Sequence, residues 1–353
     1  MTFADVLEIK NGRNQRAVED PNGVYPIYGS GGIMGYANDY ICEAETVIIG
    51  RKGNINKPIF VDEPFWNVDT AFGLAAKKGL LLPKYLYYFC LRYDFEKHNK
   101  TVTIPSLTKA DLLNIRIELP SIEVQQRTID TLQKIERVLD LRQHQLTALE
   151  DLIKARFVEM FSDEKRVLPM RDICSVITDG THQPPKFVPE GIPFIFVSNI
   201  TGNTLTYDAE KFIDQATYDE LIKRTPIEIG DILLSTVGSY GHPAVVKSDK
   251  RFLFQRHIAY LKPRREIVNS DYLHGAILSP NAQMQIEEGV RGIAQKTLNL
   301  SEIKKMTIPV PEITRQQQFA AFVAQIDKSK SVIQKSLDET QLLFDSLMQK
   351  YFG

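Results

Sequence analysis

The sequence is poor in cysteine and has no long hydrophobic run. Its three cysteines, Cys42, Cys90 and Cys174, lie far apart. An odd, scattered set of thiols fits neither a disulfide framework nor a zinc site, and it predicts reduced cysteines in a cytoplasmic protein. Even the longest apolar runs are short, residues 319–324 being one of them, so we expect no transmembrane helix. The N-terminus lacks the basic start and apolar block of a secretory signal.

The sequence also lacks an excess of charge of either sign. It has 43 basic and 44 acidic side chains among 353 residues, so the total charge gives no signal for binding to nucleic acid or to a membrane. A hydrophobic content of 43% is typical of a globular protein with a full core and argues against disorder. The length predicts two or three domains.

Common catalytic motifs are absent as well. Residues 29–35 are rich in glycine, but Met34 stands where G-x-G-x-x-G needs its last glycine, and no G-K-[S/T] follows. The sequence has no [N/D]-P-P-[Y/F], H-E-x-x-H, C-x-x-C or G-x-S-x-G, and its six histidines show no metal spacing. We therefore expect no covalent chemistry and no metal in this chain. A nuclease site made of scattered carboxylates would carry no such motif and stays an alternative.

What the sequence does contain is an internal repeat. Residues 105–161 align without a gap on residues 296–352, which pairs Leu107 with Leu298, Ile117 with Ile308, Pro120 with Pro311 and Gln125 with Gln316. The preceding residues repeat more weakly, because 46–49 resemble 231–234 and 85–86 resemble 272–273. The chain is therefore two copies of a globular segment, each followed by a helical segment.

The helical segments show a heptad pattern. Neither has a Gly or Pro between its opening proline, Pro120 or Pro311, and its last aromatic residue, so nothing should interrupt the helix. Ser121 is a plausible N-cap, and Thr314 with Gln317 fits a capping box. Apolar side chains recur as in a coiled coil at Leu132, Leu139, Leu146, Ile153 and Met160, then at Phe319, Ile326, Ile333, Leu337, Phe344 and Leu347.

Two such helices in one chain predict antiparallel pairing. Each would be roughly 50–60 Å long, whereas a domain of about 100 residues has a radius of gyration near 13 Å. The alternative, in which each helix only covers its own domain, is therefore less favoured. Lys330, Arg142 and Arg156 interrupt the apolar seam and would face each other or a partner.

The globular segments are predicted to be α+β with an irregular sheet. The short helices fall at residues 83–92 and 270–278, and strand-like alternation also occurs at 115–119 and 306–310. Residues 28–36, 50–57 and 178–186 are expected to be loops rich in Gly, Asn, Ser and Thr. The predicted strands are 46–49, 59–61, 192–197, 231–234, 251–254 and 257–261.

This layout resembles the specificity (S) subunit of type I restriction–modification systems. The resemblance covers essentially the whole chain in the family's order, and it is carried by residues 25–36, 178–182, 191–195 and 230–235 and by the Pro-x-x-x-x-Gln-Gln junctions at 120–126 and 311–317. It implies two globular target recognition domains, 1–120 and 162–311. Two long antiparallel helices, 121–161 and 312–353, would join them as a coiled coil with pseudo-twofold symmetry.

The resemblance also implies the function. Each globular domain would read one half of a bipartite, asymmetric site in double-stranded DNA. The helices would set the spacer, about 15 base pairs for a separation of roughly 50 Å, and would dock two adenine-N6 DNA methyltransferase subunits. Restriction subunits that translocate and cleave DNA at the cost of ATP would join through those. The chain itself would be non-catalytic and without a cofactor, while S-adenosylmethionine, ATP and Mg would bind to the partners.

Candidate DNA-binding residues follow from chemistry. Phosphates take Arg, Lys, Ser and Thr, and base edges take Arg, Asn, Gln, Ser and Thr. In the first domain the candidates in or near turn-rich loops are Arg13, Asn14, Arg16, Ser30, Arg51, Lys52, Asn54, Lys57, Lys100 and Thr101. In the second domain they are Thr181, His182, Lys186, Ser239, Tyr240, His242, Gln255, Arg256, Arg291 and Gln295.

Two other functions stay open at this point. The chain could be a coiled-coil scaffold that binds only proteins, or an S-type subunit of a complex that methylates DNA without cleaving it. The near-neutral charge of every segment predicts weak DNA binding by the isolated chain, because lone DNA-binding domains usually carry a basic surplus. Phosphate contacts would come from local patches or be shared with partner subunits.

Overall fold

The computed structural model describes residues 1–99, 104–292 and 295–353. It divides into two compact units, unit 1 with Met1–Gln143 and Gln334–Gly353 and unit 2 with His144–Ile333. Both units combine helices with sheets, which confirms the predicted α+β class with two domains. Both long helices are divided between the units, so the predicted boundaries between domains and helices stay predictions.

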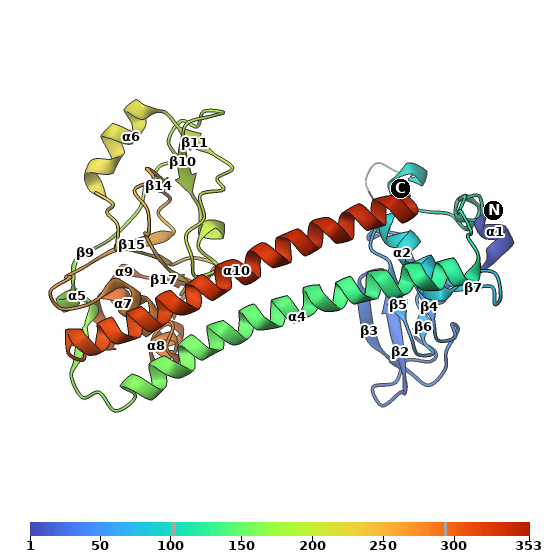
Figure 1. Cartoon of the computed structure of the whole chain (residues 1–353), viewed down its shortest axis with the longest axis horizontal. Coiled ribbons are helices and arrows are strands. Elements are labelled where there is room, and N and C mark those ends of the chain that lie inside the picture. The colour runs from blue at the N-terminus through green and yellow to red at the C-terminus, as the bar shows by residue number, and fades with distance from the viewer. Residues whose placement is uncertain (100–103, 293–294) are drawn as a thin grey trace. The chain divides into compact units, whose positions relative to one another are not determined.

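The elements of unit 1 come mainly from the first part of the chain (Figure 1). They are α1 (Phe3–Val6), β1 (Leu7–Asn11), β2 (Tyr25–Gly29), β3 (Gly32–Ala37), β4 (Thr46–Gly50), β5 (Ile59–Val61), β6 (Trp66–Asn67), β7 (Ala71–Ala76), α2 (Pro83–Arg92), η1 (Phe95–His98), α3 (Lys109–Leu113), the start of α4 (Ile122–Phe161) and the end of α10 (Ile313–Phe352).

Unit 2 holds the remaining elements, together with the end of α4 and the start of α10. They are β8 (Val167–Pro169), α5 (Met170–Ile173), β9 (Cys174–Asp179), β10 (Ile192–Ile195), η2 (Val197–Asn199), β11 (Phe212–Ile213), α6 (Gln215–Leu221), η3 (Ile222–Arg224), β12 (Ile232–Ser235), β13 (Pro243–Val245), β14 (Leu253–Phe254), β15 (Ile258–Pro263), α7 (Ser270–Ile277), α8 (Pro280–Gly289), β16 (Val290–Arg291), β17 (Thr297–Leu298), α9 (Leu300–Lys305) and β18 (Thr307–Pro309).

The two units share one sheet topology. Unit 1 has an antiparallel sheet in the order β1-β7-β4-β5, and unit 2 has one in the order β9-β15-β12-β13. Each also has a three-stranded sheet, β3-β2-β6 in unit 1 and β11-β10-β14 in unit 2, in which one neighbour of the middle strand is antiparallel and the other parallel. The predicted internal repeat is therefore confirmed for these two sheets, to which unit 2 adds the pairs β8-β18 and β16-β17.

The core of each unit lies on both faces of its four-stranded sheet. On β4, Val47 and Ile49 face the cluster that contains α2 and the ends of the long helices, and Ile48 faces the opposite way. On β12, Ile232 and Leu234 face α7 and the long helices, and Leu233 faces the other cluster. This is the period-2 alternation of a sheet that is covered on both sides.

The long helices pack on each other within each unit. In unit 2, Lys330 Nζ of α10 lies 2.9 Å from Glu150 Oε1 of α4, and the ring of Phe319 lies 5.4 Å from that of Phe157. Residue numbers rise along α4 as they fall along α10, so the pairing is antiparallel, as predicted. In unit 1, Leu132 of α4 and Met348 of α10 belong to one core cluster.

The predicted seam positions are buried or half-buried. Lys330 meets a carboxylate there, and Arg156 has its guanidinium carbon 5.9 Å from the ring centre of Phe322 in unit 2. The buried seam residues are Leu132, Leu146 and Phe319, and the half-buried ones are Leu139, Ile153, Met160, Ile326, Ile333, Leu337, Phe344 and Leu347.

A buried glutamine fixes the start of each long helix. In unit 2, Gln316 accepts from Asn269 N (2.8 Å) and donates to Ile267 O (3.0 Å) and Pro311 O (2.8 Å). In unit 1 the equivalent Gln125 makes three corresponding bonds: it accepts from Leu82 N (2.9 Å) and donates to Leu80 O (3.0 Å) and Pro120 O (3.0 Å). We call these three bonds the glutamine clamp. They explain why the proline and the first glutamine of the Pro-x-x-x-x-Gln-Gln junctions recur in both copies.

Three local predictions were wrong. Helix α10 already begins at Ile313, so Thr314 lies inside its first turn and forms no capping box, because the first turn is held by Gln316. Residues 28–36 are not a loop but the hairpin of β2 and β3, although their glycines do permit the tight turn we expected. Residues 115–119 form no strand of their own and share only one bridge, Thr2 with Arg116, because their partner is the short segment 1–3.

The other predicted short elements are confirmed. Helix α2 has the predicted bounds, and α7 ends one residue earlier than predicted. Each of the predicted strands overlaps β4, β5, β10, β12, β14 or β15. In the described part of the chain, no helix combines the length and the apolar character needed to cross a membrane.

Candidate nucleic-acid interface

Loops gather at one edge of the four-stranded sheet in unit 1. Asn11 at the end of β1 pairs with Phe72 of β7, and Gly50 at the end of β4 pairs with Ala71 at the start of β7. The loops that leave these strand ends therefore emerge together. We call the surface made by residues 12–16, 30–31, 51–57 and 68–70 edge 1.

Edge 2 is the corresponding surface of unit 2. Asp179 at the end of β9 pairs with Ala259 of β15, and Ser235 at the end of β12 pairs with Ile258 at the start of β15. We define edge 2 as residues 179–182, 236–242, 255–257 and 295–297.

Equivalent backbone hydrogen bonds stabilise the two edges. Four bonds hold edge 1, from Arg13 N to Asn67 O (2.9 Å), Arg51 N to Thr70 O (2.7 Å), Gly53 N to Pro105 O (3.0 Å) and Leu107 N to Arg51 O (2.9 Å). Four equivalent bonds hold edge 2, from Thr181 N to Phe254 O (2.9 Å), Thr236 N to His257 O (2.9 Å), Gly238 N to Lys296 O (3.2 Å) and Leu298 N to Thr236 O (2.8 Å). We call these four bonds the frame of each edge. The frame is thus repeated in the two units, whereas the side chains on it differ.

A glycine is required at one place in each frame. A Cβ on Gly12 would lie 1.8 Å from Val68 O, and a Cβ on Gly180 would lie 2.3 Å from Phe254 O. No side chain fits at such distances from backbone atoms. Sequence reasoning missed both residues, although Asn11-Gly12 and Asp179-Gly180 recur at nearly the spacing that relates the two copies.

The structure brings most candidates of the first domain to edge 1. Arg13, Arg16, Arg51, Lys52 and Asn54 are exposed there, and a Cβ on Gly50 would lie 3.1 Å from Ser30 Cβ, which places the hairpin turn against the loop after β4. Asn14 accepts the N–H of Arg16 and so shapes its own turn. Lys57 is exposed but takes no part in the four frame bonds. Lys100 and Thr101 lie outside the described residues.

Candidates of the second domain divide into two groups. Thr181 and Gln255 form a bridge, and Arg256 N donates to Thr181 O, so these three residues and the neighbouring His182 are together on edge 2. Ser239 is exposed on the loop after β12.

The second group has partners within unit 2. The Tyr240 hydroxyl donates to the Glu287 carboxylate and accepts from Lys296 Nζ (3.4 Å). His242 Nδ1 lies 3.0 Å from Asn203 Oδ1, and burial lowers the pKa of this histidine, which favours the neutral ring. Arg291 donates to the carbonyl groups of Glu288 and Val290. The remaining candidates are both exposed, Gln295 on edge 2 and Lys186 outside it.

The chemistry available at the edges is hydrogen bonding and positive charge. Guanidinium, ammonium, hydroxyl and amide groups contact phosphates and base edges. Within residues 1–99, 104–292 and 295–353, no group of three or more His, Cys, Asp or Glu side chains could hold a metal ion. Burial raises the pKa of the Cys42 and Cys174 thiols to about 12, so neither is an activated nucleophile.

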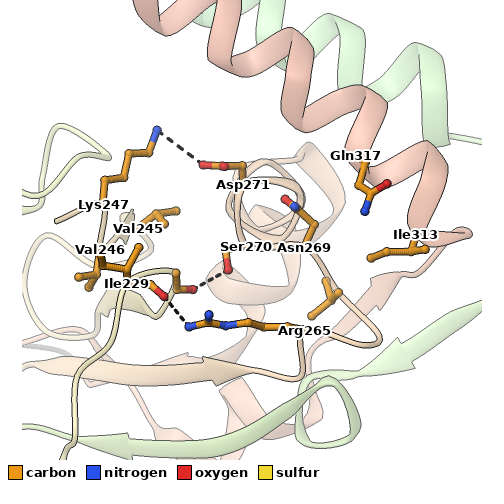
Figure 2. Close-up of a pocket in the computed structure, with 12 residues that line it drawn as sticks. Ile229, Val245, Val246, Lys247, Arg265, Asn269, Ser270, Asp271, Ile313 and Gln317 are labelled. Carbon is orange, nitrogen blue, oxygen red and sulfur yellow. Dashed lines mark hydrogen bonds and ion pairs between the residues drawn. The ribbon is translucent and has the colours of Figure 1, made fainter. Parts of the chain in front are cut away.

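A pocket of about 440 Å3 lies elsewhere in unit 2, beside the start of α10 (Figure 2). Its two cations already have partners, since Lys247 Nζ lies 3.6 Å from Asp271 Oδ1 and Arg265 donates to Ile229 O. Arg265 follows the C-terminal end of β15, whereas edge 2 adjoins the N-terminal end of that strand. The pocket is therefore not part of edge 2.

Comparison with known proteins gives one family. The family model described as type I restriction modification DNA specificity domain matches residues 1–151 and 166–340. The EcoBI type I restriction enzyme specificity subunit of Escherichia coli is 22% identical over 348 residues, which covers 87% of this chain and 73% of the relative. A putative type I restriction enzyme specificity subunit of Haemophilus influenzae is 21% identical and covers 94% of this chain and 86% of its own length.

Solved structures agree at the level of the fold. The S subunit of a type I restriction–modification system from M. genitalium aligns with a TM-score of 0.60 and 16% identity, over 100% of this chain and 95% of that one. A chain from a study of complex assembly and conformational transition in a type I system aligns with a TM-score of 0.56, also at 16% identity, over 100% of this chain and 96% of that one. Since the family model matches both copies of the repeat, this chain is a specificity subunit that belongs to the type I restriction–modification DNA specificity family.

Proposed function

We propose that unit 1 and unit 2 each read one half of a bipartite, asymmetric DNA site, through edge 1 and edge 2. The observation that carries this proposal is the repeated frame with different side chains. Equivalent backbone bonds place the exposed Arg13 where unit 2 has the half-buried Thr181, and the exposed Arg51 where it has the buried Thr236. Arg can make a bidentate contact with guanine that Thr cannot make, so two such surfaces would select different half-sites.

The charge of edge 1 supports a role in binding the DNA backbone, which edge 1 would share with partner subunits. Edge 1 combines Arg13, Arg16, Arg51, Lys52 and Lys57, although the chain as a whole has a net charge of −1. Affinity from phosphate contacts scales with the number of cations that displace counterions. In the proposal the isolated chain binds DNA weakly, and partner subunits supply the remaining contacts.

The long helices are proposed to set the spacer and to dock the other subunits. Helices α4 and α10 each have 40 residues, which corresponds to about 60 Å. Two adenine-N6 methyltransferase subunits would bind along them, flip the target base and methylate it with S-adenosylmethionine. Restriction subunits that use ATP and Mg would join that complex. In this proposal the specificity subunit takes no chemical part and binds no cofactor.

The test is to co-express the chain with its methyltransferase subunit and to map N6-methyladenine across a genome by single-molecule sequencing. We expect one bipartite motif with a fixed gap, which disappears when the chain is deleted. Exchange of residues 1–120 for those of another specificity subunit should change one half of the motif, and exchange of residues 162–311 the other half. Methylation that does not depend on the chain would refute the proposal and favour a scaffold that binds only proteins.

A further inference from the structure

One carboxylate on edge 2 holds two cationic or polar side chains. Asp179, the last residue of β9, accepts from Arg224 NH2 at 2.6 Å through one oxygen. Its other oxygen lies 2.9 Å from His182 Nε2. The Asp179 side chain is only 20% exposed, whereas Arg224 and His182 are about half exposed, at 51% and 52%. The carboxylate is thus an inner support, and its two partners face outward.

Arg224 reaches this place from an addition that unit 1 does not have. It is the last residue of η3, which follows α6 in the connection from β11 to β12. In unit 1 the corresponding connection, residues 38–45, is fully described and contains no helix. Sequence reasoning did not select Arg224, because it lies 45 residues from Asp179 and outside the repeated motifs.

The contact places the Arg224 guanidinium on edge 2. Asp179 directly precedes Gly180 and Thr181, and the bond from Thr181 N to Phe254 O of β14 is part of the frame. A guanidinium has five N–H donors, and the contact with Asp179 Oδ1 uses one nitrogen. With half of the side chain exposed, donors remain to reach a ligand at this edge.

The charge of the Asp179–Arg224 pair indicates which kind of ligand this edge would bind. The carboxylate of Asp179 cancels the charge of Arg224, so the group contributes little to the counterion release that drives phosphate binding. What the carboxylate supplies is orientation, because its contact with NH2 restricts the directions in which the guanidinium fork can point. An oriented fork matches the O6 and N7 acceptors of guanine, the commonest specific contact of arginine in the major groove.

We propose that Arg224 reads a guanine in the half-site bound by unit 2 and that Asp179 is its positioning residue. This inference rests on the proposed function of edge 2. Unit 1 carries Asn11 at the position equivalent to Asp179, as the last residue of β1. A carboxamide is therefore compatible with the fold at this place, which makes Asp179→Asn a mild variant.

The experiment maps methylation by the complex with Arg224→Ala, using Arg265→Ala as the matched control. Arg265 is similarly exposed, at 58%, and also contacts a carboxylate, Glu228, but it lies beyond the other end of β15. Arg224→Ala should relax the motif at one guanine of one half-site, with about 10- to 100-fold less discrimination there. Arg265→Ala should leave the motif unchanged.

Several outcomes would overturn the inference. A lower methylation level with an unchanged motif in Arg224→Ala would assign a phosphate contact instead of base reading. If Arg224→Ala abolishes methylation, Arg224→Lys keeps the charge without the fork, and a motif that stays intact in this variant would equally refute the inference. Failure of the proposed function is distinguishable, because then the wild-type complex itself yields no bipartite motif.

Asp179→Asn tests the positioning role separately. Loss of one negative charge should make binding to the cognate duplex more dependent on salt, by about one unit in the slope of log affinity against log salt concentration. The same variant should relax the motif at the position read by Arg224, since the fork is no longer held by a charged partner. An unchanged salt slope together with an unchanged motif would exclude Asp179 as a positioning residue.

Discussion

Replacement of Gly180 by alanine should disable one half of DNA recognition while the protein still folds. A Cβ at this position would lie 2.3 Å from Phe254 O and 2.5 Å from Gln255 O. Both are backbone atoms, so no side-chain rotation relieves the contact. Carbon and oxygen normally approach to about 3.3 Å, and the loop after β9 must therefore move by about 1 Å relative to the loop after β14.

The size of the effect follows from the bonds that this shift affects. Thr181 N donates to Phe254 O at 2.9 Å, and Arg256 N donates to Thr181 O at 3.0 Å. Two lost hydrogen bonds cost about 2 kcal/mol, and residual overpacking adds about 1 kcal/mol. Since domains unfold at a cost of about 5–15 kcal/mol, unit 2 should remain folded. A displacement of about 1 Å can lower a rate roughly 100-fold, so methylation at the cognate site should fall by that order.

The assay combines urea unfolding of the full chain with methylation of cognate and half-substituted duplexes by the complex. Gly202→Ala is the matched control, because the nearest atom to its added Cβ is Thr204 Oγ1, at 3.8 Å. Gly12→Ala should produce the same defect in the other half of the motif. If Gly180→Ala changes neither the unfolding free energy nor the methylation rate by more than the control does, the close backbone contact at edge 2 has no role in recognition.

Three further predictions concern the supports of the site. Gln316→Ala removes three buried hydrogen bonds and should lower the unfolding free energy by about 3 kcal/mol in urea, against less than about 0.5 kcal/mol for exposed Gln318→Ala. Lys330→Glu should lower the melting temperature, and adding Glu150→Lys should recover most of the loss, with a coupling of about 0.5–1 kcal/mol for this partly exposed pair. The three cysteines are buried, and burial raises the pKa of Cys42 to about 12, so at pH 8 a disulfide reagent should label no thiol in the native protein and all three in urea.

Patterns that depend on periodic burial could be predicted from the sequence. The heptads predicted two long helices that pair, because an apolar seam recurs every seven residues whatever surrounds it. Helix α2 was predicted with its actual bounds for a similar reason, since Pro83 opens an amphipathic stretch. The repeat itself was visible because it preserves the residues that build the core.

The site was less predictable because its frame is made of backbone. The bond from Arg51 N to Thr70 O has its equivalent from Thr236 N to His257 O, and nothing in the side chains of these four residues reveals it. Only the paired glycines leave a signal, and they are single residues in a diverged stretch. Arg224 leaves no signal at all, since it belongs to a helical addition, α6 and η3, that the corresponding connection of unit 1 lacks.

The same separation between frame and side chain would allow one fold to serve the two half-sites that we propose. Edge 1 and edge 2 are stabilised by N–H and carbonyl groups, which every non-proline residue supplies, and by a glycine at one fixed place. Side chains such as Arg13 and Thr181 occupy equivalent positions without making the frame bonds. Their exchange should cost little stability, as for most exposed substitutions. Specificity at these positions can therefore change by substitution while the sheet, the buried glutamine clamps and the helix seam stay the same.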